Sequence, residues 1–268
     1  EDMGYEVESS HHETAPAQHE IDFKFTGANE MADCVMNFKM AVRTIAKRHG
    51  LHATFMPKPK NGVDGSGMHI NMSLSRDGRN IFQDSHDPNG LSQEAYYFLG
   101  GILKHIKGMT LILNPLVNSY KRLMPGYEAP THIAWSGRNR TPLIRIPATR
   151  GEETRIELRS PDPACNPYLA LAICLAAGLD GIKNKIVPPD AMEGNMHLLT
   201  PEELEERGIE SLPKNLQEAV EEFEKDPLMK EVLGEEVCGK YSMAKKKEWE
   251  DYNATVSQWE IDSYLLRI

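Results

Sequence analysis

The sequence predicts an α+β protein in which a largely antiparallel sheet is flanked by helices. Several short segments alternate between polar and apolar residues, which is the period of a strand with one buried face. Longer segments repeat their apolar residues at helical spacing instead, as amphipathic helices do. The chain of 268 residues is long enough to bury a sizeable core. We expect one domain, with a helical C-terminal extension over about residues 200–268.

The composition is typical of a globular protein and argues against several kinds of partner. Hydrophobic residues make up 40% of the chain and charged residues 26%. A net charge of −10 argues against nucleic acid or an anionic membrane as the main partner. No apolar run reaches the roughly 18 residues that a transmembrane helix needs. Because the chain starts without an initiator Met or a signal peptide, we expect it to be part of a longer protein.

The cysteines indicate a reducing compartment. They are far apart in the sequence and form no CxxC pair, so a disulfide framework or a zinc site is not expected. We therefore expect a cytoplasmic protein with four reduced thiols: Cys34, Cys165, Cys174 and Cys238.

The first 25 residues predict extended structure. Residues 4–8 form a short strand candidate, and residues 10–20 are dense in His and Glu. Pro16 lies between Glu13 and Glu20 and forbids a regular helix there, so two extended segments joined by a bend are expected. The alternation resumes from Glu20, which places this acid on the polar face of a strand.

Residues 29–49 predict an amphipathic helix that ends at Gly50. Residues 56–75 then combine two prolines, a loop with three glycines and an alternating strand. A solvent-exposed outer face of a hairpin is the simplest interpretation of such a strand taken alone. Its polar face consists of His69, Asn71, Ser73 and Ser75.

The second half of the chain predicts alternating helices and strands. A helix over residues 92–107 is expected to end at Gly108, and a loop over residues 123–130, bounded by Pro and Gly, carries Glu128. The helix expected over residues 166–180 is apolar nearly all round, which predicts a buried core helix. Short strands are expected at residues 132–136, 143–147 and 154–160, and charged helices after the capping box that begins at Thr200.

A run of arginines points to the binding of anions. Solvent-exposed surfaces usually mix Arg with Lys, whereas Arg alone favours planar, bidentate contacts with phosphate or carboxylate. Salt bridges within an interface are the alternative. Between residues 122 and 159 there is no lysine but seven arginines: Arg122, Arg138, Arg140, Arg145, Arg150, Arg155 and Arg159.

Four residues on predicted polar faces could hold a metal ion: Glu13, Glu20, His69 and Glu157. Three carboxylates and one imidazole suit Mg²⁺ or Mn²⁺ better than zinc. Taken one at a time, each acid is more often a surface residue than a ligand. Together with the arginines and the glycine loop, they indicate metal-assisted phosphoryl transfer. Neither a Walker sequence nor a Rossmann GxGxxG motif is present, so ATP would be bound in another way.

Long motifs of this chain resemble the catalytic domain of bacterial-type (type I) glutamine synthetases. They are SHHETAPAQHEIDF, NGVDGSGMH, SYKRLMPGYEAP, NRTPLIRIP, TRIELRSPDPACNPYLALA and GLDGIKNK, and they cover nearly the whole chain in order. The resemblance implies a glutamine synthetase/guanido kinase-like fold with a curved half-barrel sheet. It also implies ATP-dependent ligation of ammonia to L-glutamate through a γ-glutamyl phosphate, in nitrogen assimilation, with two or more Mg²⁺ or Mn²⁺ ions in each active site.

The resemblance also implies a role for individual residues. Glu13 and Glu20 would hold one cation, and His69 and Glu157 the other. Glu128 would be the acid of a flap that closes over the intermediate and accepts a proton from ammonium, and Arg140 and Arg159 would act in catalysis beside it. The nucleotide site would consist of Glu8, Phe23, Lys24, Phe25, Asn71, Met72, Ser73, Arg140, Arg145 and Arg155. The glutamate site would consist of Asp64, Gly65, Arg122, Glu128, Arg140 and Arg159.

Two features leave alternatives open. Family members usually carry Asn where this chain has Asp64, which keeps open a related ligase that joins glutamate to another amine. A non-catalytic assembly or sensory module on the same scaffold is a second alternative. The resemblance further implies that an N-terminal β-grasp domain and the first catalytic strand precede this chain, which we expect to be inactive without them. It also implies a homo-oligomer of two stacked hexameric rings, with active sites between subunits.

Overall fold

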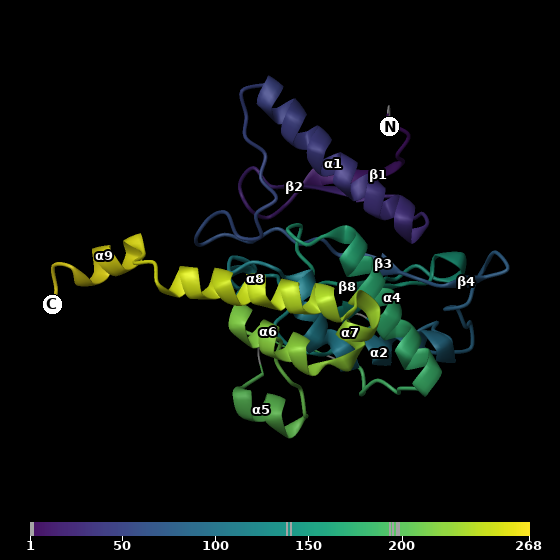
Figure 1. Cartoon of the computed structure of the whole chain (residues 1–268). Coiled ribbons are helices and arrows are strands. Elements are labelled where there is room, and N and C mark those ends of the chain that lie inside the picture. The colour runs from purple at the N-terminus through teal and green to yellow at the C-terminus, as the bar shows by residue number, and fades with distance from the viewer. Residues whose placement is uncertain (1–2, 138, 140, 193, 195, 197–198) are drawn as a thin grey trace.

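The computed structural model describes residues 3–137, 139, 141–192, 194, 196 and 199–268. An N-terminal hairpin and helix α1 lie on one side of a mixed body of strands and helices, and the C-terminal helices lie on the other (Figure 1). The strands are β1 (Val7–His12), β2 (His19–Phe23), β3 (Ile70–Met72), β4 (Ser75–Arg76), β5 (Arg79–Asn80), β6 (Trp135–Ser136), β7 (Ile144–Arg145) and β8 (Ile156–Leu158). The helices are α1 (Ala28–Arg48), α2 (Gln93–Leu113), α3 (Ser119–Arg122), α4 (Pro167–Asn184), α5 (Pro201–Glu206), α6 (Leu216–Lys225), α7 (Pro227–Leu233), α8 (Glu235–Asn253) and α9 (Gln258–Tyr264), with a 3₁₀ turn at Gly151–Glu153.

The mixed α and β composition expected from the sequence is confirmed, but the described strands are short and belong to three sheets. Strands β1 and β2 form an antiparallel hairpin, and β4 and β5 form another. The central sheet has the order β3-β8-β7-β6; its β3–β8 and β7–β8 pairs are antiparallel, and its β6–β7 pair is parallel. No closed sheet forms among these described strands.

Helices α2 and α4 form the centre of the core, and glycines let their backbones approach closely. A Cβ atom on Gly101 would lie 2.1 Å from the carbonyl oxygen of Ala177, and one on Gly181 would lie 2.0 Å from that of Tyr97. Real atoms do not approach so closely, so each glycine is required by its partner helix. Most of α2 is buried, including Phe98.

One expectation about these helices is wrong, and the other holds for one face of the helix. Gly108 does not end its helix, because α2 continues to Leu113. A Cβ on Gly108 would lie 2.7 Å from that of Asp226, so this glycine serves helix packing rather than chain reversal. The expected core helix α4 is confirmed on one face, where Ile173 and Cys174 are buried, but its opposite face is exposed at Tyr168, Leu175 and Leu179.

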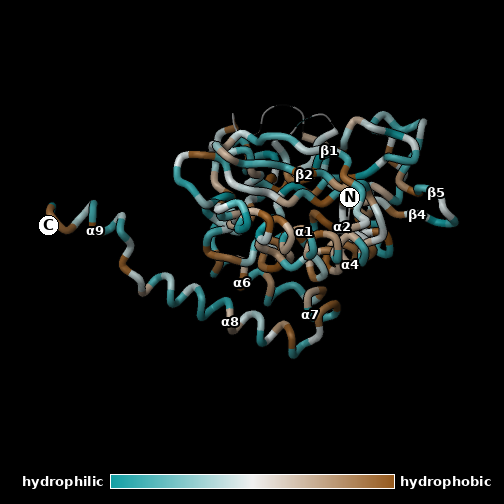
Figure 2. The backbone as a smooth tube through the Cα atoms, turned by 90° about the horizontal axis from the view of Figure 1, so that it is seen from above, coloured by the Kyte–Doolittle hydropathy of each residue, from teal (hydrophilic) through white to brown (hydrophobic). Residues whose placement is uncertain are grey.

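The chain ends in a series of helices. The capping box at Thr200 is confirmed, since its hydroxyl accepts from the Glu203 N–H and the Glu203 carboxylate accepts from the Thr200 N–H. Four helices, α6 to α9, follow α5, as the expected series of charged helices. The last, α9, lies far from the body, and exposed apolar residues mark this end (Figure 2).

The cysteines and the helices agree with the sequence-based expectations. All four cysteines are buried and free, as expected for reduced thiols. Within the described part of the chain, no helix combines the length and the apolar composition that crossing a bilayer requires.

Candidate functional site

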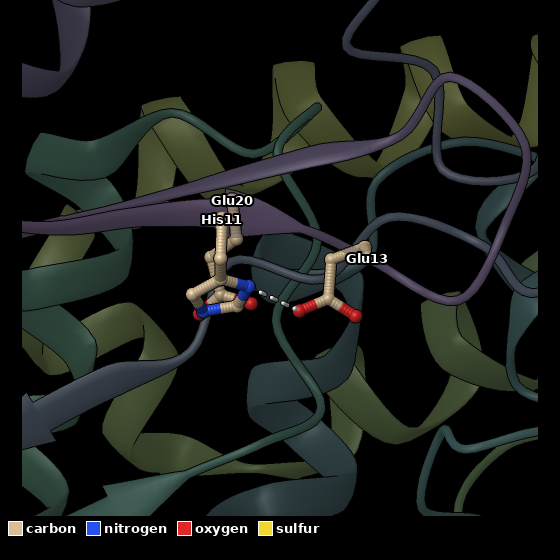
Figure 3. A group of neighbouring side chains, drawn as sticks. All are labelled: His11, Glu13 and Glu20. Atoms are coloured by element: carbon tan, nitrogen blue, oxygen red, sulfur yellow. Dashed lines mark ion pairs between the residues drawn. The ribbon is translucent and has the colours of Figure 1, made fainter.

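The N-terminal hairpin brings together one imidazole and two carboxyl groups. In the β1–β2 register His11 lies opposite Glu20, and Glu13 follows at the bend. The bend is closed by the Glu13 N–H, which donates to the Gln18 carbonyl over 3.0 Å. Ligand atoms of His11, Glu13 and Glu20 all lie within 4.8 Å of one another, with His11 Nδ1 3.6 Å from Glu13 Oε1 (Figure 3). Glu13 and Glu20 were predicted ligands, whereas His11 was not.

The electrostatics of this cluster favour a bound cation. A hydrogen bond with the Glu13 carboxyl, burial and the neighbouring Asp22 raise the pKa of Glu20 to about 8. Two carboxyl groups this close repel each other when both are ionised. A divalent cation removes that repulsion, and two carboxylates with one imidazole are a suitable donor set for Mn²⁺ or Mg²⁺. The residues present therefore fit a metal site.

A second cluster surrounds Glu157 on the central sheet. In the register Glu157 lies between Asn71 of β3 and Arg145 of β7. Its Oε1 lies 3.2 Å from His69 Nδ1 and 3.2 Å from Arg159 Nη1, and its Oε2 lies 2.5 Å from Arg145 Nε. Only 6% of the Glu157 side chain is exposed. The predicted pair His69–Glu157 is thus in contact, together with two of the predicted arginines.

Opposing effects set the ionisation of this pair. Burial alone would raise the pKa of Glu157, but the hydrogen bond and charge of His69 and the charges of Arg159 and Arg145 outweigh it, and the pKa is lowered. Burial lowers the pKa of His69, against the effect of Glu157. An ionised carboxylate beside a neutral imidazole is the state in which both groups can bind a metal.

The glycine loop contacts both the N-terminal hairpin and the sheet cluster. Gln18 of the hairpin donates from Nε2 to the Gly65 carbonyl over 3.0 Å and to Ser66 Oγ over 3.1 Å. A Cβ on Gly67 would lie 2.6 Å from Arg122 Nη2 and 3.0 Å from His69 Nε2, so a larger residue there would displace one of these side chains. The loop therefore connects the hairpin cluster to the sheet cluster. Gln18 was not predicted as a site residue. Its partners lie far along the chain, so no local sequence pattern indicates these contacts.

Arg122 is more deeply buried than a simple ligand-binding arginine. Its Nη1 donates to the Ser160 carbonyl over 2.6 Å, and its Nη2 donates to the Arg159 carbonyl over 3.1 Å. Burial lowers the pKa of Arg122 to about 10, with Asp162 opposing this effect. Through these two hydrogen bonds, Arg122 stabilises the backbone of the segment that carries Arg159.

The remaining residues of the predicted nucleotide site lie on or next to strands of two separate sheets. On β3, Asn71 is exposed and accepts a hydrogen bond from Arg155 Nε over 3.2 Å, while Met72 is half-buried against the core. Ser73 is exposed just beyond β3.

The other predicted nucleotide-site residues lie in the hairpin region. Glu8 is exposed on β1, and Phe25 is exposed after β2. Phe23 packs edge-on against Phe38 at 5.2 Å, and Lys24 pairs with Glu6 at 2.7 Å. Among the described residues no hydrogen bond joins residues 23–25 to residues 71–73.

The predicted flap acid lies next to the glycine loop. Glu128 is exposed, and its backbone N–H donates to Asp64 Oδ1 over 3.3 Å. Arg140, predicted to act in catalysis and to contact both the nucleotide and glutamate, lies outside the described residues.

Comparison with known proteins gives a consistent result. The family described as "Glutamine synthetase, catalytic domain" matches residues 1–264. The glutamine synthetase of Clostridium saccharobutylicum is 57% identical over 99% of this chain and 60% of its own length. That of Thermotoga maritima is 54% identical over the same shares of the two chains. This chain thus spans about 60% of the length of the curated relatives it matches.

Solved structures agree with the sequence matches. The structure named "GmaS/ADP complex-Conformation 1" superposes with a TM-score of 0.89 at 39% identity, over 98% of this chain and 61% of its own. "Apo GmaS without ligand" superposes with a TM-score of 0.86 at 39% identity, over 98% and 60%.

Proposed function

The chain belongs to the family of glutamine synthetase catalytic domains, and we propose from this that it carries out the ATP-dependent ligation of ammonia to L-glutamate. The reaction gives L-glutamine through a γ-glutamyl phosphate and serves nitrogen assimilation. The observation that supports it best is the pair of clusters, one at Glu13 and Glu20 and one at His69 and Glu157, on either side of the glycine loop.

The two clusters would hold divalent cations, Mg²⁺ or Mn²⁺. Glu13 and Glu20, with His11, form one donor set, and His69 with Glu157 forms the other. When bound, the cations screen the negative charges of the ATP phosphates and the glutamate carboxylate. Without that screening, a carboxylate would be repelled by the phosphoryl group it must attack.

Positive side chains complete the anion site. Arg145 and Arg159 both form ion pairs with Glu157. Arg155 lies nearby and donates a hydrogen bond to Asn71. On cation binding at Glu157, these guanidinium groups can reorient toward phosphate oxygens, for which their planar donors are suited. From its place in the family motif, Arg140 would stabilise the negative charge of the transferred phosphoryl group. The nucleotide would lie along residues 23–25 and 71–73 beside Glu8. The similarity of this chain to a structure named as an ADP complex supports nucleotide binding by this fold.

The glutamate substrate would lie near the glycine loop, with Asp64, Gly65 and the segment braced by Arg122 around it. Glu128 would accept a proton from ammonium so that neutral ammonia attacks the acyl phosphate. A flap that excludes water also prevents hydrolysis of that intermediate.

Three further proposals concern the whole protein. The described sheets would form part of the curved half-barrel of the family. The chain would act as one catalytic domain with a helical C-terminal extension, in a cytoplasmic homo-oligomer whose active sites lie between subunits. Four free thiols are consistent with a cytoplasmic location.

The test is an assay of phosphate release by the enzyme that contains this chain, with ATP, glutamate, Mg²⁺ and either ammonium or methylamine. We expect glutamate-dependent turnover with ammonium and much less with methylamine. Equal or faster turnover with methylamine would establish the related amine ligase instead. Absence of any glutamate-dependent phosphate release would favour a non-catalytic module.

A further inference from the structure

Two contacts join the loop that carries Glu128 (residues 123–130) to residues 58–64. The Lys58 ammonium nitrogen lies 3.2 Å from the centroid of the Tyr127 ring, which is a close cation–π contact. One residue further along, the Glu128 N–H donates to Asp64 Oδ1 over 3.3 Å. Two consecutive residues at the tip of the loop, Tyr127 and Glu128, are thus held by contacts with residues 58–64.

Lys58 is itself fixed in place. Its N–H donates to Asn118 Oδ1 over 2.8 Å, and Asn118 Nδ2 donates back to the Lys58 carbonyl over 3.1 Å. Its ammonium also donates to the Val63 carbonyl, and the residue is only 8% exposed. A lysine held at both its backbone and its tip is an ordered point charge, unlike the mobile lysines of most surfaces.

Asp64 adds a negative charge beside this lysine. Burial lowers the pKa of Lys58, and the charge of Asp64 opposes this effect. The family resemblance implies Asn at the position of Asp64. Asn would keep an oxygen to accept from the Glu128 N–H, but it would not balance the Lys58 charge.

The Glu128 carboxylate has no hydrogen-bond or ion-pair partner in the described part of the chain. Its location therefore depends on how the backbone of residues 127 and 128 is held. A general base is effective only when it lies within hydrogen-bond reach of the proton it accepts.

We propose that Lys58 and Asp64 are positioning residues that hold the Glu128 loop over the glycine loop through Tyr127 and the Glu128 N–H. The inference rests on the proposed function for its consequence in catalysis, but not for the contact itself. The two parts are therefore tested by separate measurements.

The contact is tested by hydrogen–deuterium exchange of the purified protein, followed by mass spectrometry of peptides that cover residues 123–130. Lys58→Met removes the charge and keeps the aliphatic stem, and we expect exchange roughly 5- to 30-fold faster. Lys60→Met is the matched control, since Lys60 is exposed two residues away, and should change nothing. Tyr127→Phe keeps the ring and should preserve protection, whereas Tyr127→Leu should lose it. Equal exchange in Lys58→Met and wild type would overturn the proposal.

Asp64 is tested with a graded pair. Asp64→Asn keeps an acceptor for the Glu128 N–H and should loosen the loop less than Asp64→Ala. Equal protection in wild type and both variants would remove Asp64 from the proposal.

The consequence for catalysis is tested by steady-state kinetics. In Lys58→Met we expect kcat with ammonium to fall while KM for ATP stays within about twofold, and Lys58→Arg, which restores a cation over the ring, should recover most of the loss. A parallel loss of ATP binding, or no rescue by Arg, would mean a general structural defect. If wild type itself shows no ligase activity, the proposed function fails, while the exchange result still decides whether the contact holds the loop.

Discussion

Glu157 is the residue on which the sheet cluster depends. A buried carboxylate with His69, Arg145 and Arg159 around it is stabilised in its charged form, as the lowered pKa of Glu157 shows. Removal of one partner from such a network leaves the others buried without compensation, which typically costs about 3–5 kcal/mol.

We therefore predict two effects of Glu157→Gln. Mn²⁺ affinity, measured by titration with electron paramagnetic resonance detection, should fall by about tenfold or more. The melting temperature should also fall. Glu153→Gln, an exposed acid on the neighbouring 3₁₀ turn, is the control and should leave both unchanged. An unchanged Mn²⁺ titration in Glu157→Gln would show that Glu157 is not a ligand.

His11 should contribute to the hairpin cation site. Its ring nitrogen lies near both carboxyl groups, so His11→Gln should weaken Mn²⁺ binding by several-fold or more. His12→Gln is a matched control, because His12 is the next residue along the strand and its ring packs on that of His19 at 4.5 Å. Equal affinities of the two variants would contradict a role for His11.

The difference between predicted and missed site residues has a physical cause. Glu20, His69 and Glu157 could be predicted because alternation along a strand places each on a polar face. The same alternation relates His11 to Glu13, two residues apart, and would have found His11 if applied to residues 10–13. Gln18 and Lys58 act across the chain, and no local pattern encodes a contact of that kind.

At the scale of elements, glycines allow α2 and α4 to cross in close contact. Gly181→Ala would place a methyl group against the Tyr97 carbonyl of α2, and backbone cannot move aside as a side chain can. We predict a loss of about 1–3 kcal/mol or more in the free energy of unfolding, measured by urea titration. In contrast, Gly239→Ala in α8 has no atom within 4 Å of the new methyl group and should be neutral or stabilising by up to about 1 kcal/mol. Similar effects of the two substitutions would show that the crossing is not so close.

The starts of α4 and α5 and the end of α1 next to Gly50 could be predicted from local residues, whereas the end of α2 could not. Asn166 accepts from the N–H groups of Tyr168 and Leu169, and the capping box at Thr200 forms as expected, because caps are local interactions. Gly108 was misread as a helix end because a glycine that serves close packing looks the same in sequence as one that ends a helix. Strand lengths were overestimated for a related reason, since pairing depends on partners far along the chain.

At the scale of the whole molecule, one buried histidine connects three helices. His105 of α2 lies 2.9 Å from Asp180 of α4 through Nε2, and 2.8 Å through Nδ1 from Asp226, the N-cap of α7. Lys104 pairs with the same Asp180 at 3.1 Å. Burial alone would lower the pKa of His105, but the hydrogen bonds of the two aspartates outweigh it, and the pKa is raised.

This arrangement predicts a pH-dependent stability. The pKa of His105 in the folded state is above its unfolded value of about 6.5. Its contribution to the free energy of unfolding is therefore full below pH 6.5 and is lost as the pH rises through the folded-state pKa. The His105 hydrogen bond is the main cause of the lowered pKa of Asp180. The contribution of Asp180 to stability is therefore lost only as the solution becomes strongly acidic. At pH 6, His105→Gln should be less stable than wild type by roughly 1.5–3 kcal/mol. The difference should shrink at alkaline pH. A difference that is constant with pH would contradict the assignment.

The C-terminal end of the chain carries more apolar surface than a free helix should expose. Leu266 is 96% exposed and Ile268 fully exposed, Trp259 of α9 is mostly exposed, and the segment lies far from the body (Figure 1). A monomer rarely leaves such a patch uncovered. Since the family resemblance implies stacked rings, we predict that this tail docks on another subunit.

Deletion of residues 255–268 from the enzyme that contains this chain should therefore reduce the size of its assembly, measured by light scattering. Two point variants separate docking from a general effect of hydrophobicity. Trp259→Ser, within the tail, should weaken assembly, whereas Val187→Ser should not, because Val187 is 72% exposed elsewhere on the surface. The free energy of unfolding should stay within about 0.5 kcal/mol in both, since neither side chain is buried in the chain itself. An assembly of unchanged size after the deletion would mean that the apolar tail serves some contact other than the one that joins the subunits.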